Sequence, residues 1–332
     1  MPFKLIKGTF HVRNYSPDGD SIRFRPDDPG LVHALAGSTP RFNVRNHVQL
    51  RIEAIDTLET HFTPSSGGGT LHQPLKHANA ATDKLMEFVG IKNVEWDSAH
   101  TIVTKADDET RGYILARTVE KNGRPVAFVY AGDPSENDGD DVFLDVDRLQ
   151  SSYNHLALAE GYAYPTYYRG LFHDLRDALT TAVEGARNQG LRIHEVDRTN
   201  AGFNASTLQS IVEEHTIFPK LFRRLAEYMV NGGTAVSFKR KLAQSREPVF
   251  DLRESNFTHF DTFVEQADNS VDIRLTRRPE ELVFDEMPAR PRNVFSVLMG
   301  GEVAEPRHFS EVLSLLKELL PEEAVQDSPL QG

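Results

Sequence analysis

Two short acidic elements contain the residue types that bind a hard cation. Asp18-Gly19-Asp20-Ser21 lies in a turn signal that follows an apolar run, and Asp56-Thr57-Leu58-Glu59 ends a second, alternating run. Carboxylates at rigid strand ends can converge on one cation. Asp20 and Asp56 would then supply one oxygen each, a backbone carbonyl a third, and water the rest, a shell that calcium tolerates. Taken alone, each element is also typical of an ordinary turn or a helix cap.

Three further residues extend this set toward phosphodiester chemistry. Glu59 follows Asp56 by three residues, close enough to the metal to orient or deprotonate a water molecule. Arg51 lies in the strand-like run before Asp56, and Arg124 lies in the turn Asn122-Gly123-Arg124. Two arginines that converge on a phosphodiester neutralise the charge that develops on its oxygens. Together these residue types would suit metal-assisted hydrolysis of a phosphodiester.

The elements that must position these residues are mostly strands. A hairpin is expected over 3–25, because apolar runs flank the turn at Ser16 to Asp20. A second strand is expected at Val48 to Ile55, and a helix opens at Pro74 and stops at Gly90. Pro26 to Asn46 is expected to be a long loop. The remaining expected elements of this part are strands at 94–104, 113–119 and 126–130, and helices at about 152–161 and 172–189. This order predicts a small β-barrel decorated by helices.

The pattern changes after about Asp197, and Thr199 to Asn204 has the composition of a linker. We expect helices at 206–215 and 219–230, strands within 248–285, and an amphipathic helix at about 309–320. The two predicted domains are residues 1–196 and residues 197–332, the second a mixed α/β domain of unknown fold. Basic residues alternate with aromatic ones here, which indicates either a nucleic-acid patch or, the favoured interpretation, the solvated face of amphipathic helices. These residues are Phe218, Lys220, Phe222, Arg223, Arg224, Phe238 and Lys239-Arg240-Lys241.

The composition limits the class of protein. The chain has 332 residues, of which 39% are hydrophobic and 26% are charged, and it has no cysteine. Disulfide scaffolds, cysteine zinc sites and thiol nucleophiles are therefore excluded. Apolar runs are shorter than the roughly 18 residues of a membrane span, and Lys4 and Lys7 interrupt the region where a signal peptide would be apolar, so we expect a cytoplasmic protein without membrane contact. The net charge of −12 opposes long-range attraction to nucleic acid.

Residues Gly8 to His194 resemble the staphylococcal nuclease (thermonuclease) family, whose fold is a five-stranded OB-like barrel with three helices. The resemblance covers a little over half of the chain, and its motifs are specific in combination. They are Asp18 to Ser21, Arg51 to Thr60, Gly123 to Tyr130, Tyr153 to Ala163, Glu184 to Arg187, and Gly190-Leu191. The fold class that follows is α+β, an OB-fold-like nuclease barrel with the second domain after it.

The resemblance implies a metal-dependent nuclease, a hydrolase, and the alternative is a barrel that binds nucleic acid or protein without catalysis. It also implies roles for individual residues. Asp20, Asp56 and the carbonyl of Thr57 would bind Ca²⁺, or Mg²⁺ or Mn²⁺ in its place. Glu59 would act as the base or orient the attacking water molecule. Arg51 and Arg124 would bind the phosphate. Lys121 and Tyr167 would contact the nucleic-acid substrate, DNA or RNA. The second domain would contribute a DNA contact or a protein partner.

Four positions depart from the family pattern. Ser21 and Leu58 replace a usual threonine and proline, while Asn122 and Arg169 stand where aromatic residues are common. Because proline would fix φ, its loss predicts a less rigid Glu59 loop.

Overall fold

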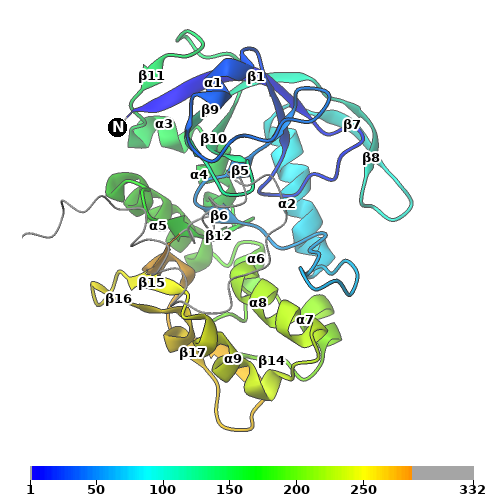
Figure 1. Cartoon of the computed structure of the whole chain (residues 1–332), viewed down its shortest axis with the longest axis vertical. Coiled ribbons are helices and arrows are strands. Elements are labelled where there is room, and N and C mark those ends of the chain that lie inside the picture. Colours follow the sequence, from blue (N-terminus) through cyan, green and yellow to red (C-terminus); the bar gives the residue numbers. More distant parts are fainter. Residues whose placement is uncertain (1, 286–332) are drawn as a thin grey trace, which may run out of the picture. The chain divides into compact units, whose positions relative to one another are not determined.

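The structure is a computed structural model of the whole chain, and it describes residues 2–285 (Figure 1). The helix expected at about 309–320 lies outside the described residues. All of the described residues belong to one compact unit. Within this part of the chain, no helix is long and apolar enough to cross a membrane.

An eight-stranded sheet forms the first half of this unit, with the order β4-β2-β1-β9-β10-β5 and with β11 on β1 and β3 on β9. β4 and β5 are at opposite ends of this order, yet only Leu50 separates them in the chain. The sheet therefore curls until its ends nearly meet, which gives a barrel-like shape. Its strands are β1 (Phe3–His11), β2 (Arg23–Pro26), β3 (Ala36–Gly37), β4 (Val48–Gln49), β5 (Arg51–Ile52), β9 (Thr110–Val119), β10 (Pro125–Ala131) and β11 (Asp141–Val142).

The predicted hairpin and both later strands are confirmed, because β1 pairs with β2 and β9 pairs with β10. The strand expected at 94–104 is wrong, since β7 (Lys92–Trp96) and β8 (Val103–Asp107) form a separate hairpin. The reversal is fixed by Asp97, whose carboxylate accepts from the backbone N–H groups of Thr101 and Ile102. An Asp side chain that caps backbone groups a few residues ahead favours a turn over a continuous strand.

Helices cover the barrel and include the three expected there. These are α2 (Leu75–Phe88), α4 (Tyr153–Ala159) and α5 (His173–Asn188); shorter helices are α1 (Pro29–His33), α3 (Val146–Gln150) and α6 (Ile193–Val196). α1 and β3 lie within the stretch expected to be a loop at 26–46. Asn154 on α4 is fully buried and donates to the carbonyls of Glu53 and Ala127, which ties the helix to the barrel near Arg51.

The second half of the unit contains three helices and two small sheets. α7 (Leu208–Glu213) and α8 (Pro219–Val230) confirm the two expected helices, and α9 (Phe238–Ser245) follows. One sheet has the order β13-β19-β15-β16 and the other β14-β18-β17. The bounds are β13 (Tyr167–Tyr168), β14 (Phe203–Asn204), β15 (Pro248–Asp251), β16 (Asn256–His259), β17 (Val264–Glu265), β18 (Asp272–Leu275) and β19 (Leu282–Phe284).

The two halves share a sheet and a hydrophobic core. β13 belongs to the first half of the chain, but it pairs with β19 near the end of the described residues. A second hydrophobic cluster joins Leu58, Ala78 and Tyr164 to Phe218 and Phe222 of the following half. The boundary expected at 196/197 therefore crosses a shared core. The division of the chain at 196/197 is tested only by expression of the fragment 1–196.

Candidate active site

The acidic turn between β1 and β2 is held in place by close packing. Asp18 and Ser21 exchange backbone hydrogen bonds of 3.1 and 3.2 Å, and the Tyr153 hydroxyl donates to the Gly19 carbonyl at 2.8 Å. A Cβ at Gly19 would lie 2.7 Å from the Ala81 Cβ and 2.8 Å from the Thr57 Cγ2. Only glycine allows this turn to approach so closely, and the approach brings it against the second acidic element.

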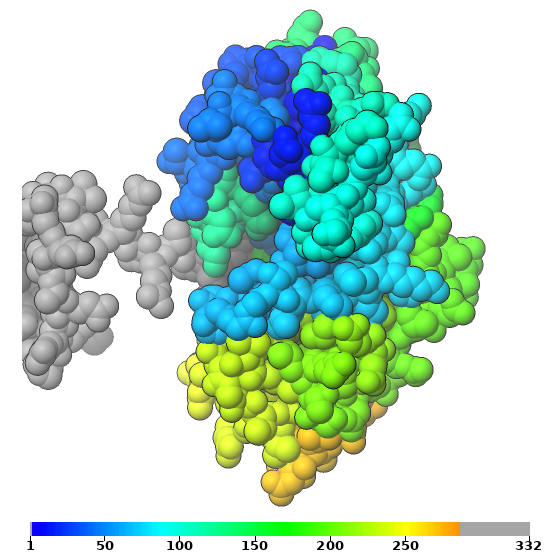
Figure 2. Space-filling view, turned by 90° about the vertical axis from the view of Figure 1, so that its right-hand side faces the viewer, coloured from blue at the N-terminus to red at the C-terminus, as the bar shows by residue number. Residues whose placement is uncertain are grey.

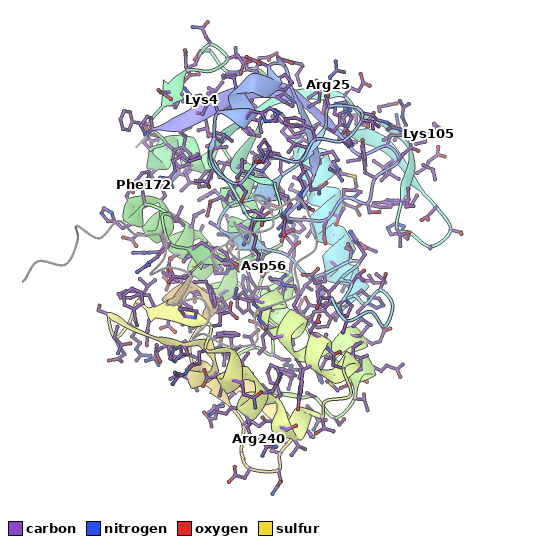
Figure 3. All side chains as sticks on the ribbon, in the orientation of Figure 1. Lys4, Arg25, Asp56, Lys105, Phe172 and Arg240 are labelled. Carbon is purple, nitrogen blue, oxygen red and sulfur yellow. The ribbon has the colours of Figure 1, made fainter. Side chains whose placement is uncertain are left out.

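The second acidic element leaves the barrel at β6 (Ile55–Asp56), which pairs with β12 (Tyr164–Pro165). Asp56 is 4% exposed and lies near the centre of the described unit, where Figure 3 labels it. Leu58, at the position where the family pattern has proline, is buried in the second hydrophobic cluster. Its burial anchors the Glu59 loop by packing instead of by a fixed φ. The expected loss of rigidity is thus offset by a side-chain anchor.

Gln73 fixes the backbone of this loop and connects it to the later half of the chain. The side-chain oxygen of Gln73 accepts from the backbone N–H of Glu59 at 3.3 Å. The backbone N–H of Gln73 donates to the backbone carbonyl of Glu59 at 2.8 Å. Its side-chain nitrogen donates to the carbonyl of Ile217, just before α8, at 2.8 Å. Because Gln73 is fully buried, these bonds are sheltered from water.

Four carboxylates of the two elements lie close enough to perturb one another. Burial first, and then the charges of Asp56 and Glu59, raise the pKa of Asp20 to about 7. Burial also raises the pKa of Asp18, with Asp20 adding to the rise. The pKa of Glu59 is raised by burial as well, against the opposing charge of Arg223. We call Asp18, Asp20, Asp56 and Glu59 the carboxylate cluster.

Arg223 of α8 pairs directly with the carboxylate cluster. Its two terminal nitrogens donate to the two oxygens of Asp56, Nη1 to Oδ1 at 2.9 Å and Nη2 to Oδ2 at 2.7 Å. Nη1 also donates to the Glu59 carboxylate. The Arg223 side chain is 26% exposed, the Glu59 side chain 15% and the Asp56 side chain 6%. This is a mostly buried, bidentate ion pair between segments far apart in the chain.

The two predicted phosphate arginines lie at the border of the cluster. The Arg51 guanidinium is 4.4 Å from the ring centroid of Tyr168. Burial alone would raise the pKa of Tyr168, but the cations Lys220 and Arg51 bring it below its ordinary value, and Asp56 and Arg223 also lie close enough to act on it. Arg124 donates from Nε to the buried Glu120 carboxylate at 3.0 Å, and its charge opposes the rise in the pKa of Asp20. Both arginines are partly exposed. They present positive charge beside the carboxylates, as a phosphate-binding role requires.

The structure brings six of the eight predicted site residues together. Asp20, Asp56, Thr57, Glu59, Arg51 and Arg124 all lie in or beside the carboxylate cluster. Tyr167 is fully buried, and its hydroxyl bonds to Thr180 Oγ1 at 3.0 Å; its contact with substrate stays a prediction. Its neighbour Tyr168 stacks with Arg51 instead. Lys121 is exposed in the β9–β10 turn.

The donor set fits a divalent cation, with one competitor. The carboxylates of Asp20 and Asp56 and the carbonyl of Thr57 are the hard oxygen ligands that calcium prefers. Thr57 Oγ1 is buried without a hydrogen-bond partner, an orphaned polar atom at the same place. Mutual repulsion among buried carboxylates is the condition that a divalent cation relieves. The competitor is the Arg223 guanidinium, which already bonds to both oxygens of Asp56.

Sequence reasoning grouped Arg223 and Arg224 with a nucleic-acid patch or, the favoured interpretation, a solvated helix face, and it missed the contact of Arg223 with the cluster. In the structure Arg223 bonds to Asp56 and Glu59, and Arg224 pairs with Glu247 at 3.0 Å. One signal could have found the placement. In α8 the buried Pro219, Phe222 and Ala226 follow the spacing of a core-facing helical stripe, and Arg223 occupies the fourth position after Pro219. A cation on an apolar stripe must find a buried anion.

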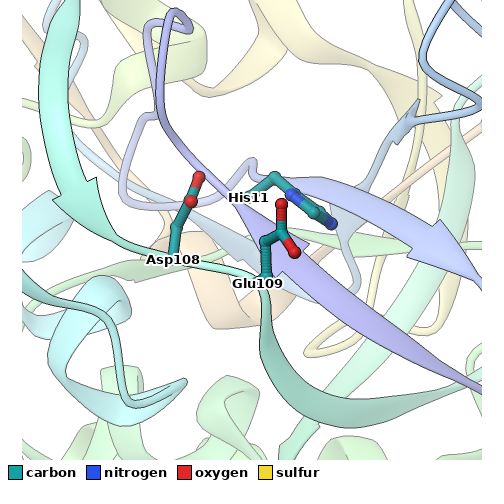
Figure 4. Close-up of side chains that lie close together, drawn as sticks. All are labelled: His11, Asp108 and Glu109. Atoms are coloured by element: carbon teal, nitrogen blue, oxygen red, sulfur yellow. The ribbon is translucent and has the colours of Figure 1, made fainter.

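A second group of metal-ligating residue types lies at the far end of β1. Figure 4 shows His11, Asp108 and Glu109, whose ligand atoms lie within 4.8 Å of one another. Two of them are already engaged: Asp108 accepts from the backbone N–H groups of Val12 and Arg13, and His11 Nε2 is 2.8 Å from a threonine hydroxyl. These bonds join the end of β1 to the β8–β9 turn, which gives the group a structural role.

A cleft of about 770 Å³ is lined by parts of α5 and of the segment from β18 to β19. Four arginines and four acidic residues line it, so its charges balance. None of the predicted site residues lines this cleft, and its size alone does not make it the candidate site.

The chain matches no protein-family model, and no curated protein matches it either. The functional argument therefore rests on the geometry of the carboxylate cluster and the arginines beside it.

Proposed function

We propose that this chain is a metal-dependent phosphodiesterase that hydrolyses DNA or RNA. The observation that supports the proposal is the gathering of one carboxylate set from two distant turns, with Arg51 and Arg124 beside it. Buried acidic groups with perturbed pKa values are concentrated at functional sites, which makes this set a candidate active site. The same set carries the resemblance to the staphylococcal nuclease family.

In this proposal each residue has one task. Asp20, Asp56 and the Thr57 carbonyl would hold the divalent cation, which when bound supplies positive charge to the phosphate oxygens. Glu59 orients the attacking water and takes its proton. Arg51 and Arg124 bind the non-bridging oxygens, and their charge counts most in the transition state. In the family's reaction the 5′ oxygen leaves, so the product would end in a 3′-phosphate.

A second candidate is favoured by one observation. Arg223 already neutralises Asp56 and Glu59, which is what a barrel that had lost catalysis would need to keep buried carboxylates stable. Such a barrel would bind nucleic acid or a protein without cutting. Arg240 and Lys241 on α9 are exposed and would offer a contact to a phosphate backbone in either case.

The test is incubation of the full chain with end-labelled single- and double-stranded DNA and RNA. Each substrate is offered with Ca²⁺, Mg²⁺, Mn²⁺ or excess chelator, and the product ends are identified. We expect cleavage that requires a cation, and no cleavage by a Glu59→Gln control. Undiminished cleavage in chelator would contradict a metal-dependent mechanism. Retention of labelled nucleic acid without cleavage under every condition would favour the binding module.

A further inference from the structure

The Arg223 guanidinium occupies the face of Asp56 that a metal ion would need. Both carboxylate oxygens of Asp56 are used, at 2.9 and 2.7 Å, and the same guanidinium reaches Glu59. A cation that took an oxygen of Asp56 would share that oxygen with a charged donor. Two positive charges on one small carboxylate repel each other strongly when the site is largely closed to water.

We propose that Arg223 is a built-in competitor of the divalent cation, so that the metal binds Asp56 only when the guanidinium has moved away. The inference rests on the proposed metal site. It assigns Arg223 two consequences: the pair with Asp56 stabilises the chain without metal, and the same pair lowers the affinity for metal.

The moving part is the side chain of Arg223 and not the helix that carries it. α8 is anchored on both sides of Arg223, because Leu221, Phe222 and Leu225 are buried in the second hydrophobic cluster. Lys220 and Arg224 both pair with the buried Glu247, at 2.8 and 3.0 Å. A long arginine side chain can change rotamer while its backbone stays fixed.

The surroundings of α8 agree with a fixed helix. Figure 2 shows the loop before α2 lying directly against the α7–α8 region. Ser65 of that loop donates its N–H and its hydroxyl to the Glu227 carboxylate, at 3.0 and 2.5 Å. Gln73 adds the buried bond to the carbonyl of Ile217. Competition at Asp56 is therefore local and reversible, and no opening of the two halves is needed.

The charges show why the exchange can run in either direction. The Arg223 guanidinium bonds to two carboxylates of the cluster, Asp56 and Glu59, so its one positive charge is shared between two acidic groups. A divalent cation brings twice the charge but must first displace the arginine. By linkage, whatever stabilises the arginine pair weakens metal binding by the same factor.

The test is the calcium affinity of the full chain, measured by titration calorimetry for the wild type, Arg223→Gln and Arg224→Gln. Arg224→Gln is the matched control, since it removes a charge from the adjacent position of α8 without touching Asp56. We expect Arg223→Gln to bind Ca²⁺ at least tenfold more tightly than the wild type. Arg224→Gln should stay within about twofold.

Folding of the variant is checked through its thermal midpoint with and without calcium. Without metal, Arg223→Gln should melt lower than the wild type, because it leaves buried carboxylates unpaired. Calcium should raise its midpoint by more than it raises that of the wild type. Arg223→Lys, which keeps a charge but not the planar fork, should fall between the two. It serves as the second variant if Arg223→Gln does not fold.

The outcomes separate this inference from the proposed function. Equal calcium affinity in wild type and variant overturns the competition and leaves the nuclease proposal standing. Tighter calcium binding by the variant, with a wild type that binds calcium but cuts no nucleic acid, supports the competition and contradicts the nuclease proposal. Absence of calcium binding in both the wild type and the folded variant overturns both.

Discussion

Arg223 and Asp56 form a bidentate ion pair across 167 residues of sequence, with N–O distances of 2.9 and 2.7 Å. The pair joins a helix of the later half to the metal-ligand position expected in the barrel. Removal of one member of a mostly buried pair leaves the other charge uncompensated, at a cost of about 3–5 kcal/mol. The charge balance at Asp56 in the barrel therefore depends on a residue that we predicted to lie in another domain.

A first prediction concerns the expected domain boundary. We expect residues 1–196 alone to aggregate or to lack a cooperative transition, whereas residues 1–285 fold. The shorter fragment would expose Leu58, Ala78 and Tyr164, all buried against the later half, and it would unpair Asp56. Circular dichroism during urea unfolding, with gel filtration, measures both fragments. A soluble fragment 1–196 with a single sharp transition would show that the boundary drawn from sequence is correct.

A second prediction concerns the groups proposed for chemistry. Glu59→Gln, Arg51→Lys and Arg124→Lys should each lower turnover by roughly 10² or more, since each acts on the transition state. Lysine should not replace either arginine, because it lacks the planar fork that binds two phosphate oxygens. Lys92→Gln is the control, as Lys92 is exposed on β7 and belongs to none of the predicted site residues. Near-normal rates in folded variants would contradict these roles.

A third prediction tests the packing of the acidic turn. Gly19→Ala should destabilise the protein by about 1–3 kcal/mol, because its Cβ would lie 2.7 Å from Ala81 and 2.8 Å from Thr57. The same substitution at Gly185, inside α5 with open space around it, is the matched control. There alanine should stabilise by about 1 kcal/mol through helix propensity. Urea unfolding compares the two, and equal effects would mean that the turn can move aside.

The sequence predicted those parts of the fold and the site that local patterns determine. Gly90 ends α2 as expected, and the alternation around Val48 gives short strands of the barrel. Tyr167 shows the limit of such patterns. The side chains of adjacent strand residues point to opposite faces of the sheet. The pairing of Tyr167 with Val283 of β19 determines that Tyr167, and not Tyr168, points into the core. That partner lies more than a hundred residues further along, so spacing near Tyr167 could not choose between it and Tyr168.

Arg223 was hidden for a related reason. Its helix was predicted correctly, and its charge suggested a surface. Only the tertiary structure shows that the anions it needs come from the barrel. By contrast, Asp20, Asp56 and Glu59 could be grouped in advance, because two acidic turns at strand ends carry a recognisable order and spacing.

A fourth prediction concerns acid stability and His194. Burial, with the charge of Arg187, lowers the pKa of His194 to about 4. Neither ring nitrogen has a hydrogen-bond partner, and the ring packs against Tyr164 at 6.4 Å. Between pH of about 6.5 and 4, His194 is protonated in the unfolded chain but neutral in the folded chain. The contribution of His194 to stability is therefore complete above pH 6.5 and is lost as the pH falls toward 4.

His194→Phe keeps a flat ring against Tyr164 and removes the titrating group, so its stability should fall less between pH 6.5 and 4.5 than that of the wild type. Some dependence will remain, because burial also lowers the pKa of His47 to about 4. His173→Phe is the control, since His173 is exposed at the start of α5. The free energy of unfolding in urea at pH 7.5, 6.5, 5.5 and 4.5 measures all three proteins. Parallel curves for His194→Phe and wild type would show that the buried ring takes up its proton without unfolding, and the argument from burial would then be wrong.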